Sequence, residues 1–384
     1  MVYDFLVIGA TGMQGRIASR DLLQSGYSVL LAGRDKPRIE HILKKYPNRT
    51  GFAHVELRDK ENIIQVIKKS GADVVINCAE GDYNIDVLKE CIKQGVNYLD
   101  LGSDDWMTEI QFALHNSLKN KNLLSLTGCG SIPGIVNVMA KFAADKFDKI
   151  ERIDCGFDWD SNMKTFVVPY SIDTIVDEFV KKSNVIRDGK VKYIDPLTCE
   201  IDHKLIGIPA SRARSIMHQE VYTFYRAFKN KGIKTITSYG GFPDHSFNAI
   251  MELISLGLCS HDPVMVEGVK HLKINFITES FKHIGMPKGY TEKEDLWIIL
   301  QGKKDGEKKR TEMVCTAGTL KGWEDATCNI DTGMPISIMA QMVKKGLIKE
   351  KGSYSPENIV PHQHFFKELA KRDMHVYENK RRIN

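Results

Sequence analysis

Phe5-Leu6-Val7-Ile8-Gly9-Ala10-Thr11-Gly12-Met13-Gln14-Gly15 is the stretch that decides the fold. Its first four residues are an apolar run typical of a buried strand, and the glycines lead into an amphipathic segment that ends near Gly26. A second apolar run, residues 28–32, predicts another strand. Strand, glycine-rich turn, helix and strand, in that order, open a dinucleotide-binding unit. We therefore expect a nucleotide cofactor at this turn.

The three glycines of the turn have separate roles. Gly9 permits a tight turn, Gly12 lets the backbone approach a pyrophosphate, and Gly15 lets the helix lie close to the sheet. The free N–H groups at the helix start then face two negatively charged phosphates. The cofactor-binding residues predicted here are Gly9, Thr11, Gly12, Met13, Gln14 and Gly15.

The residue at the end of the second strand selects the type of cofactor. NAD-binding units usually place Asp or Glu there, to accept hydrogen bonds from the adenosine ribose. This chain has Gly33 followed by Arg34, so repulsion against a 2′-phosphate is absent and a guanidinium is present to bind it. The pattern favours NADP over NAD. Two alternatives stay open, since Asp35 can take the place of the acid and Arg34 can be an ordinary surface charge.

Strands and helices continue to alternate after this unit, with six apolar runs at residues 5–8, 28–32, 52–57, 73–78, 97–101 and 123–127. Such alternation predicts an α/β fold with a Rossmann-type, doubly wound parallel sheet. Ligands bind at the carboxyl ends of such strands. Glu56, Cys78 and Ala79 stand at those ends and are therefore further cofactor-binding candidates.

A less regular pattern follows Gly134 and predicts a second domain of α+β type. Strands are expected at 149–159, 190–194, 234–239 and 313–317, with helices at 171–182 and 247–256. A last helix is expected from Pro335, in its first turn, to Gly346. We expect a dinucleotide-binding domain at 1–130, a substrate and dimerisation domain at 131–330, and a C-terminal segment, 331–384, that packs back on the first domain.

Composition excludes several classes of protein. The 384 residues carry a net charge of +5 with both signs interspersed, which does not favour nucleic-acid binding. No run of eighteen apolar residues is present and the N-terminus enters a strand at once, so we expect neither a membrane span nor a signal peptide. Eight scattered cysteines indicate a reducing cytoplasm. His362 and His364 lack further ligands at metal-binding spacing, so no metal is expected.

Three stretches beyond simple patterning resemble the saccharopine dehydrogenase family, in particular its saccharopine reductase and lysine 6-dehydrogenase group. The first is the glycine turn, and the second is Tyr98-Leu99-Asp100-Leu101-Gly102 followed by Gly128-Cys129-Gly130-Ser131-Ile132-Pro133-Gly134-Ile135-Val136-Asn137. The third is Asp331-Thr332-Gly333-Met334-Pro335-Ile336-Ser337-Ile338-Met339-Ala340. Together they span nearly the whole chain.

The resemblance implies hydride transfer between a nicotinamide and a carbon–nitrogen bond of an amino acid. It implies that Pro133 and Gly134 line the nicotinamide, that an amino-acid-like substrate lies between two domains, and that the protein is a homodimer. In the family an Arg usually precedes the Tyr of the strand predicted at 234–239, where this chain has Ser238 and Tyr239. This loss weakens the case for a dicarboxylate substrate.

Reduction of an imine also needs an acid to protonate nitrogen. Asp104 follows the fifth strand and is one candidate, with a helix N-cap as the alternative role. Cys155 resembles a family cysteine and is the other, with a buried apolar role as the alternative. Arg212, Ser238 and Tyr239 are candidate substrate contacts, although Arg212 can equally face solvent.

These patterns lead to one hypothesis with two alternatives. We expect an NADP-dependent oxidoreductase that acts on the C–N bond of an amino-acid substrate. The first alternative is an NAD-linked lysine 6-dehydrogenase or a carboxynorspermidine-type reductase. The second is a non-catalytic protein that binds NADP and senses redox state.

Overall fold

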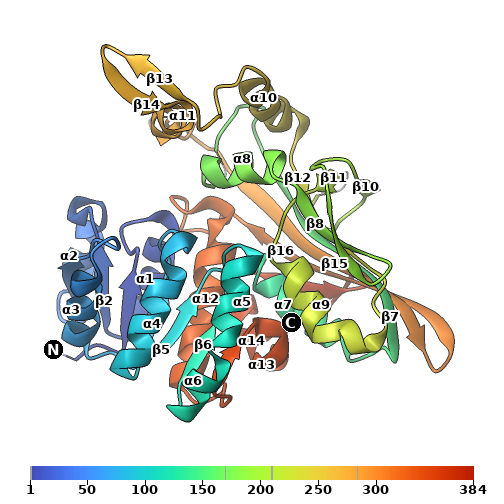
Figure 1. Cartoon of the computed structure of the whole chain (residues 1–384), viewed down its shortest axis with the longest axis horizontal. Coiled ribbons are helices and arrows are strands. Elements are labelled where there is room, and N and C mark those ends of the chain that lie inside the picture. The colour runs from blue at the N-terminus through green and yellow to red at the C-terminus, as the bar shows by residue number, and fades with distance from the viewer. Residues whose placement is uncertain (1, 169, 209–210, 283) are drawn as a thin grey trace.

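The computed structural model describes residues 2–168, 170–208, 211–282 and 284–384, which form two domains that are each built on a β-sheet (Figure 1). The first sheet has the strand order β17-β6-β5-β4-β1-β2-β3, and every neighbouring pair is parallel. Its strands are β1 (Phe5–Ile8), β2 (Val29–Gly33), β3 (Thr50–His54), β4 (Val74–Asn77), β5 (Asn97–Asp100), β6 (Leu124–Leu126) and β17 (Gly352–Tyr354). The Rossmann-type sheet expected from the sequence is confirmed.

Alternation along the central strand explains why both faces of this sheet are covered. Phe5 and Val7 pack into one apolar cluster, whereas Leu6 and Ile8 pack into the other. Helices α1 (Met13–Gln24) and α12 (Ile330–Lys344) cover the first face, and α3 (Lys60–Ser70) and α4 (Asn84–Gln94) cover the second. A strand buried on both sides needs a continuous apolar run, as found here.

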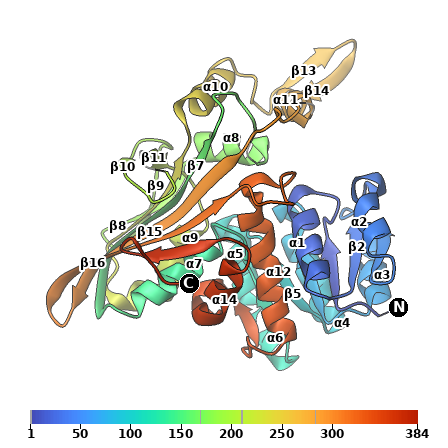
Figure 2. The same cartoon turned by 180° about the vertical axis from the view of Figure 1, so that it is seen from behind.

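The second domain is a mixed sheet with the main order β10-β11-β12-β7-β15-β16-β18-β19 (Figure 2). Its long central strands are β7 (Lys149–Ser161), β15 (Glu292–Lys304) and β16 (Glu307–Gly318), and β12 (Thr235–Gly241) runs parallel to β7. The remaining strands are β8 (Ser183–Arg187), β9 (Lys190–Ile194), β10 (Glu200–His203), β11 (Ser211–Ser215), β18 (His375–Glu378) and β19 (Arg381–Arg382). This α+β domain is the second domain predicted from the sequence.

Further helices cover the sheets and fill the connections. They are α2 (Glu40–Lys45), α5 (Asp105–Ala113), α6 (His115–Asn120), α7 (Ile135–Ala144), α8 (Ile172–Val180), α9 (Glu220–Phe228), α10 (Asp244–Ser255), α13 (Pro356–Ile359) and α14 (His362–Ala370). A hairpin, β13 (Pro263–Val266) with β14 (Val269–Leu272), and helix α11 (Lys273–Lys282) form a projecting arm (Figure 1). Within the described residues, no helix combines the length and hydropathy needed to cross a bilayer.

The structure differs from the predicted elements at one helix boundary and in one strand. Helix α12 begins at Ile330, so Pro335 lies inside it and not in its first turn. Gly333 makes the early start possible, because a Cβ there would lie 2.5 Å from the Cβ of Ile17 on α1. Strand β15 was not predicted at all, although it pairs along its whole length with β7 and β16.

The C-terminal segment divides between the two domains. Helix α12 packs on α1, and β17 extends the first sheet beside β6. Strand β18 instead pairs with β16, so residues 375–382 add to the second sheet and do not pack on the first domain as expected. The segment therefore ties the two domains together.

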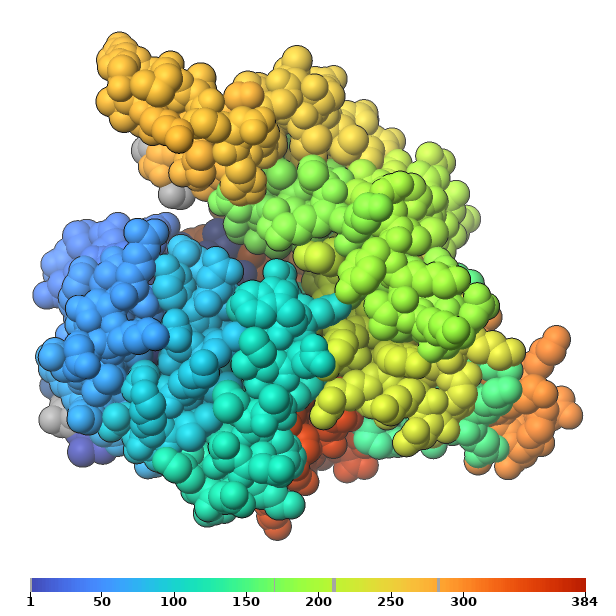
Figure 3. All heavy atoms as spheres, in the orientation of Figure 1, coloured from blue at the N-terminus to red at the C-terminus, as the bar shows by residue number. Residues whose placement is uncertain are grey.

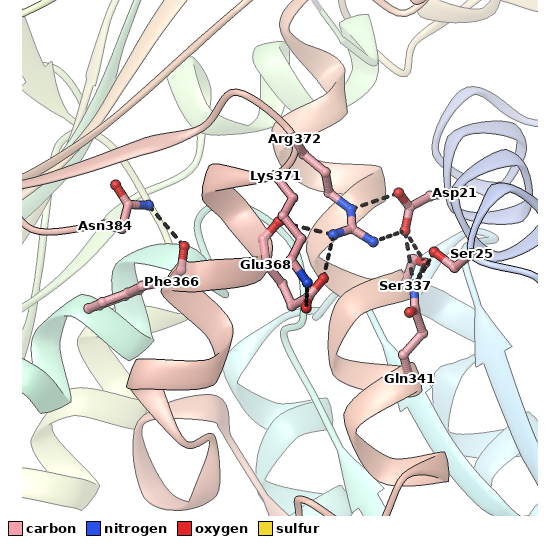
Figure 4. A network of polar contacts seen from close by, with 9 residues as sticks. All are labelled: Asp21, Ser25, Ser337, Gln341, Phe366, Glu368, Lys371, Arg372 and Asn384. Atoms are coloured by element: carbon pink, nitrogen blue, oxygen red, sulfur yellow. Dashed lines mark hydrogen bonds and ion pairs between the residues drawn. The ribbon is translucent and has the colours of Figure 1, made fainter.

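A buried ion pair anchors this segment (Figure 4). The Arg372 guanidinium, just after α14, donates to both carboxylate oxygens of Asp21 on α1, at 2.7 and 2.8 Å. Ser337 of α12 donates to the same carboxylate at 2.6 Å. Three elements that are far apart in the sequence thus meet at Asp21.

Candidate active site

A cavity of about 260 Å³ lies at the carboxyl ends of β1, β2 and β4, which is the switch point of the parallel sheet. We call it the nucleotide cavity. Of the predicted cofactor-binding residues, it is lined by Gly9, Thr11, Gly12, Arg34, Glu56, Cys78 and Ala79. The structure therefore brings together residues from four separate loops.

The backbone of the nucleotide cavity fits a diphosphate. A Cβ on Gly9 would lie 2.6 Å from the Ala79 nitrogen, and one on Gly15 would lie 2.2 Å from the Gly9 oxygen. Helix α1 begins after Gly12 without a side-chain cap, so the N–H groups of its first turn have no side-chain acceptor. Negative charge is favoured at such a helix start.

The adenosine end has no place for the acid of an NAD-binding site. A Cβ on Gly33 would lie 2.6 Å from Thr11 Oγ1, so Asp or Glu cannot be accommodated without a shift. Arg34, Arg38 and Arg58 all line the nucleotide cavity. The Arg34 guanidinium lies 3.9 Å from the Glu80 carboxylate, and both side chains are 68% exposed. Asp35 precedes a short 3₁₀ helix, η1 (Lys36–Ile39), and is not part of the described cavity wall.

A second cavity, of about 470 Å³, lies between the two domains, and we call it the interdomain cavity. Figure 3 shows a hollow between the blue and cyan elements of the first domain and the green and gold elements above them. The loop before α5, the β6–α7 loop and the start of α12 line one side, and β7 and α8 line the other. Gln14 and Pro133, two of the predicted cofactor-binding residues, lie on its wall.

Seven acidic residues line the interdomain cavity. They are Asp82, Asp104, Asp105, Asp177, Glu178, Glu294 and Asp331. Among the described residues that line it, none is Lys or Arg, and the one imidazole is His218. Several carboxylates around a cavity create a negative potential that attracts cations.

Asp104 is half-buried on this wall, at the start of α5. It occupies the N-cap position, but its side chain makes no capping hydrogen bond. The carboxylate is therefore not committed to the helix. Burial raises the pKa of the neighbouring Asp105 from 3.8 to about 6. Asn184 Nδ2 donates to this carboxylate at 2.6 Å and lowers the pKa, but the effect of burial is larger.

His218 is held between two buried acids. Its Nδ1 lies 2.8 Å from Glu220 Oε2, and its Nε2 lies 3.6 Å from Glu178 Oε1. Burial alone lowers the pKa of His218, but the two carboxylates outweigh it and raise the pKa to about 10. Tyr170 also donates to Glu178, at 2.6 Å. The imidazole is therefore cationic at neutral pH.

A hydrogen-bonded chain crosses the cavity wall near Pro133. The hydroxyls of Ser131 and Thr332 lie 2.9 Å apart, and Thr332 donates to Asp331 Oδ1 at 3.2 Å. The Asp331 carboxyl in turn faces the Glu294 carboxyl from β15. Burial, with the mutual repulsion of the two groups, raises the pKa of Glu294, and burial likewise raises the pKa of Asp331.

Several polar atoms on the wall have no partner within the described chain. They include Gln219 Nε2, Ser103 Oγ, Gln14 Oε1 and Asp331 Oδ2. Gln219 is only 6% exposed and Asp331 only 1%. Buried polar atoms are normally hydrogen-bonded, so these positions indicate where a ligand or water binds.

Other predicted residues lie elsewhere. Cys155 is fully buried in the apolar core, where its thiol faces the Thr237 carbonyl oxygen at 3.8 Å, and it is not part of the cavity wall. Ser238 lies beside it in register, and Tyr239 packs on the opposite face of the sheet against Trp297. The structure does not bring these three residues to the cavity.

Arg212 also lies away from both cavities. Its guanidinium pairs with Asp202 across the β10–β11 ladder at 3.2 Å, and its side chain is 56% exposed. Arg212 therefore lies on the surface, as in the second of the two interpretations.

Met13 does not line the nucleotide cavity and instead lines a small separate hollow, together with Arg16 and Arg20. Gly134, with φ +138°, directly follows the wall residue Pro133.

The fold and the two cavities define a class: an NAD(P)-dependent oxidoreductase with a cavity between a dinucleotide-binding domain and a second domain. Comparison with known proteins gives the family. Residues 5–126 match the saccharopine dehydrogenase NADP-binding domain, and residues 130–374 match the saccharopine dehydrogenase C-terminal domain. The chain belongs to the saccharopine dehydrogenase family, and it is a dehydrogenase that acts on CH–NH groups.

Individual relatives are distant but match over nearly their full length. Carboxyaminopropylagmatine dehydrogenase of Synechocystis sp. is 21% identical, covering 93% of this chain and 92% of the relative. Carboxynorspermidine synthase of Vibrio cholerae is 22% identical, with the same shares covered. Saccharopine dehydrogenase (L-Glu forming) of Saccharomyces cerevisiae has the same fold, with a TM-score of 0.74 at 13% identity over 100% of both chains.

Several residues of the interdomain cavity were not predicted from the sequence. Glu294 lies on the unpredicted strand β15, and Asp331 was quoted only as part of a family motif. His218 and Gln219 precede α9 in a segment without a recognisable motif. The signal for β15 was present, because Leu296 to Leu300 is an apolar run followed by the Asp305-Gly306 turn.

Proposed function

We propose that the protein is an NADP(H)-dependent enzyme that transfers hydride to or from a C–N bond of a substrate rich in amino groups. The observation that carries this proposal is the acidic wall of the interdomain cavity. An ammonium 4 Å from a carboxylate gains roughly 4 kcal/mol at an effective dielectric constant of about 20, before desolvation. A substrate with several carboxylates meets repulsion in the same place.

Two matched relatives support a cationic substrate. Their names refer to carboxylated derivatives of agmatine and norspermidine. The carboxynorspermidine-type alternative therefore gains weight over an NAD-linked lysine 6-dehydrogenase. One substrate carboxylate has a partner on the wall, since Gln219 Nε2 is an unpaired donor within the described chain. Asp104 is then available to bind a substrate ammonium group.

NADP is favoured over NAD by the adenosine end of the nucleotide cavity. Three arginines line it, and Gly33 leaves no room for an acidic side chain. Arginine forks bind phosphate in two parallel hydrogen bonds. When bound, the nicotinamide supplies the hydride, and the chain's residues hold the substrate carbon against it and exclude water. A non-catalytic sensor is not favoured, because the interdomain cavity adjoins the nicotinamide end.

A spectrophotometric screen tests the proposal. NADPH oxidation is followed with 2-oxo acids and amino-acid semialdehydes, each paired with amines that carry one, two or three amino groups. Glutamate is the dicarboxylate control. We expect turnover to rise with the number of amino groups and to be slow with glutamate. Fastest turnover with glutamate would overturn the substrate class, and equal rates with NADH would overturn the cofactor preference.

We also propose that the protein is a homodimer that uses its projecting arm. The β13–β14 hairpin exposes apolar side chains, with Met265 64% and Val269 56% exposed. Isolated two-stranded hairpins are marginally stable in water, so a partner surface would stabilise this one. Sedimentation equilibrium of the wild-type protein and of a Met265→Lys variant is the test. A monomeric wild-type protein would contradict the proposal.

A further inference from the structure

Reduction of an imine requires a proton at nitrogen. Asp331 and Glu294, on the wall of the interdomain cavity, form a pair of carboxyls that can hold such a proton. Asp331 is 1% exposed, and its Oδ2 has no donor in the described chain. The group that faces it is the Glu294 carboxyl, another acceptor. Two ionised carboxylates that face each other in a buried site repel, so the pair favours holding one proton.

The pair spans the domain boundary. Glu294 comes from β15 of the second sheet, and Asp331 comes from the first turn of α12, which packs on α1. The other titratable groups that face the pair are Glu292 on β15, Cys328 before α12, Cys315 on β16 and Tyr170 before α8. They are a carboxyl, two thiols and a phenol, so none of them supplies a positive charge that would let both carboxyls ionise.

A route leads from the pair to the substrate. Thr332 Oγ1 donates to Asp331 Oδ1 at 3.2 Å and lies 2.9 Å from Ser131 Oγ. When Asp331 carries the shared proton on Oδ1, this hydrogen bond reverses and Asp331 donates to Thr332. Ser131 belongs to the β6–α7 loop, two residues before Pro133 at the nicotinamide end. All four residues of this chain line the interdomain cavity. Each hydroxyl can accept a proton from one neighbour while it donates its own to the next.

We propose that Asp331 and Glu294 form a shared-proton reservoir that delivers a proton through Thr332 and Ser131 to the substrate nitrogen during C–N bond reduction. This inference rests on the proposed function. The hydride adds to the imine carbon, and the electrons of the C=N π bond become the lone pair on nitrogen. Ser131 gives its proton to that lone pair, Thr332 passes its own proton to Ser131, and the carboxyl pair gives its shared proton to Thr332. The pair, now doubly ionised, then takes up a proton from solvent water in the interdomain cavity, which both carboxyls line. Oxidation of the amine runs the same transfers in reverse.

The reservoir can be tested without substrate. A shared or carboxylic proton gives an infrared C=O stretch that is distinct from ionised carboxylate bands. We expect such a band in the cofactor-free protein at neutral pH, and its loss in Asp331→Asn and in Glu294→Gln. The band should survive in Asp177→Asn, which changes a wall carboxylate that pairs with Lys181. A wild-type protein without the band would overturn the reservoir.

The route is tested by kinetics on the fastest amine and carbonyl pair found in the screen. Thr332→Val keeps the shape of the side chain and removes the hydroxyl. We expect kcat to fall by about 10²- to 10⁴-fold, the usual contribution of positioned acid catalysis, with little change in the KM of the amine. Thr332→Ser should restore most of kcat. The matched control is Thr198→Val, which removes an exposed hydroxyl that donates to the Asp195 carbonyl oxygen at 2.7 Å, away from both cavities, and which should keep the wild-type rate.

The kinetic results distinguish failure of the proton relay from failure of the proposed function. Full kcat in Thr332→Val would overturn the relay and leave the proposed function standing. A raised KM with unchanged kcat in Asp331→Asn would also overturn it, because the pair would then bind the ammonium group and not supply protons. Absence of turnover by the wild-type protein with every amine would overturn the proposed function itself.

Discussion

Replacing Arg372 by Ala tests how the C-terminal segment stabilises the dinucleotide-binding domain (Figure 4). Asp21 is 4% exposed, and it would lose the two charged donors at 2.7 and 2.8 Å while keeping the Ser337 hydroxyl at 2.6 Å. Removing one partner of a buried ion pair costs about 3–5 kcal/mol. Because the Ser337 hydroxyl and the Gln341 amide, whose Nε2 lies 3.2 Å from Asp21 Oδ2, still donate to the carboxylate, we expect a loss near the lower end, roughly 3 kcal/mol.

Urea and thermal unfolding, followed by far-ultraviolet circular dichroism, measure this loss. About 1 kcal/mol shifts Tm by roughly 2–4 °C in proteins of 150–250 residues, so a fall of about 6–12 °C is the expected scale. Lys371→Ala is the matched control on the same helix end. Its ammonium binds Glu368 at 2.6 Å, but the side chain is 66% exposed, so its loss should cost under about 0.5 kcal/mol.

A double variant separates charge from packing. Arg372→Met with Asp21→Asn removes both charges, so no uncompensated carboxylate stays buried. The double variant should therefore be more stable than Arg372→Ala alone. Equal losses in Arg372→Ala and Lys371→Ala would refute the reasoning, because burial would then not matter to the pair.

Three further predictions concern the two cavities. Arg34→Ala should weaken NADP(H) binding by about 10-fold or more, the value of a charge-assisted hydrogen bond, and NAD(H) binding by under about 3-fold; equal losses in titrations of both cofactors would contradict the assignment. Asp104→Asn should lower kcat/KM for the amine without changing NADP(H) affinity, and wild-type kinetics would remove Asp104 from the site. The folded protein holds the Asp105 proton more tightly, with its pKa raised from 3.8 to about 6, so this group's contribution to the free energy of unfolding falls as pH rises through that window. Asp105→Asn should remove that part of the slope in urea titrations at each pH, and an unchanged slope would refute the raised pKa.

The first domain was predictable because its signals are local. An apolar run, a glycine turn and a helix lie within the first 24 residues, and each dictates its own geometry. The nucleotide cavity follows from them, since parallel strands bring their carboxyl ends to one edge. Gly33 also supported a prediction of cofactor type, because the absence of an acid at the end of the second strand can be seen in the sequence.

The interdomain cavity was less predictable because strand residues alternate between faces. Cys155 and Tyr239 lie on neighbouring strands, yet one points into the apolar core and the other packs against Trp297. A shift of one residue in register exchanges the two faces, and the sequence does not say which face meets the cavity. Glu294 and Asp331 are separated by the whole β15–β16 hairpin, and only tertiary packing brings them together.

The two cavities carry charged side chains of opposite sign. The chain as a whole is positive, with a net charge of +5, so an acidic wall in the interdomain cavity is not a consequence of composition. Arginines line the nucleotide cavity and carboxylates line the interdomain cavity, so each end attracts a ligand of opposite sign. This distribution of charge fits the proposed pairing of an anionic cofactor with a cationic amine. Gln14, Pro133 and Ser131, the last residue of the proposed proton route, line the same interdomain cavity.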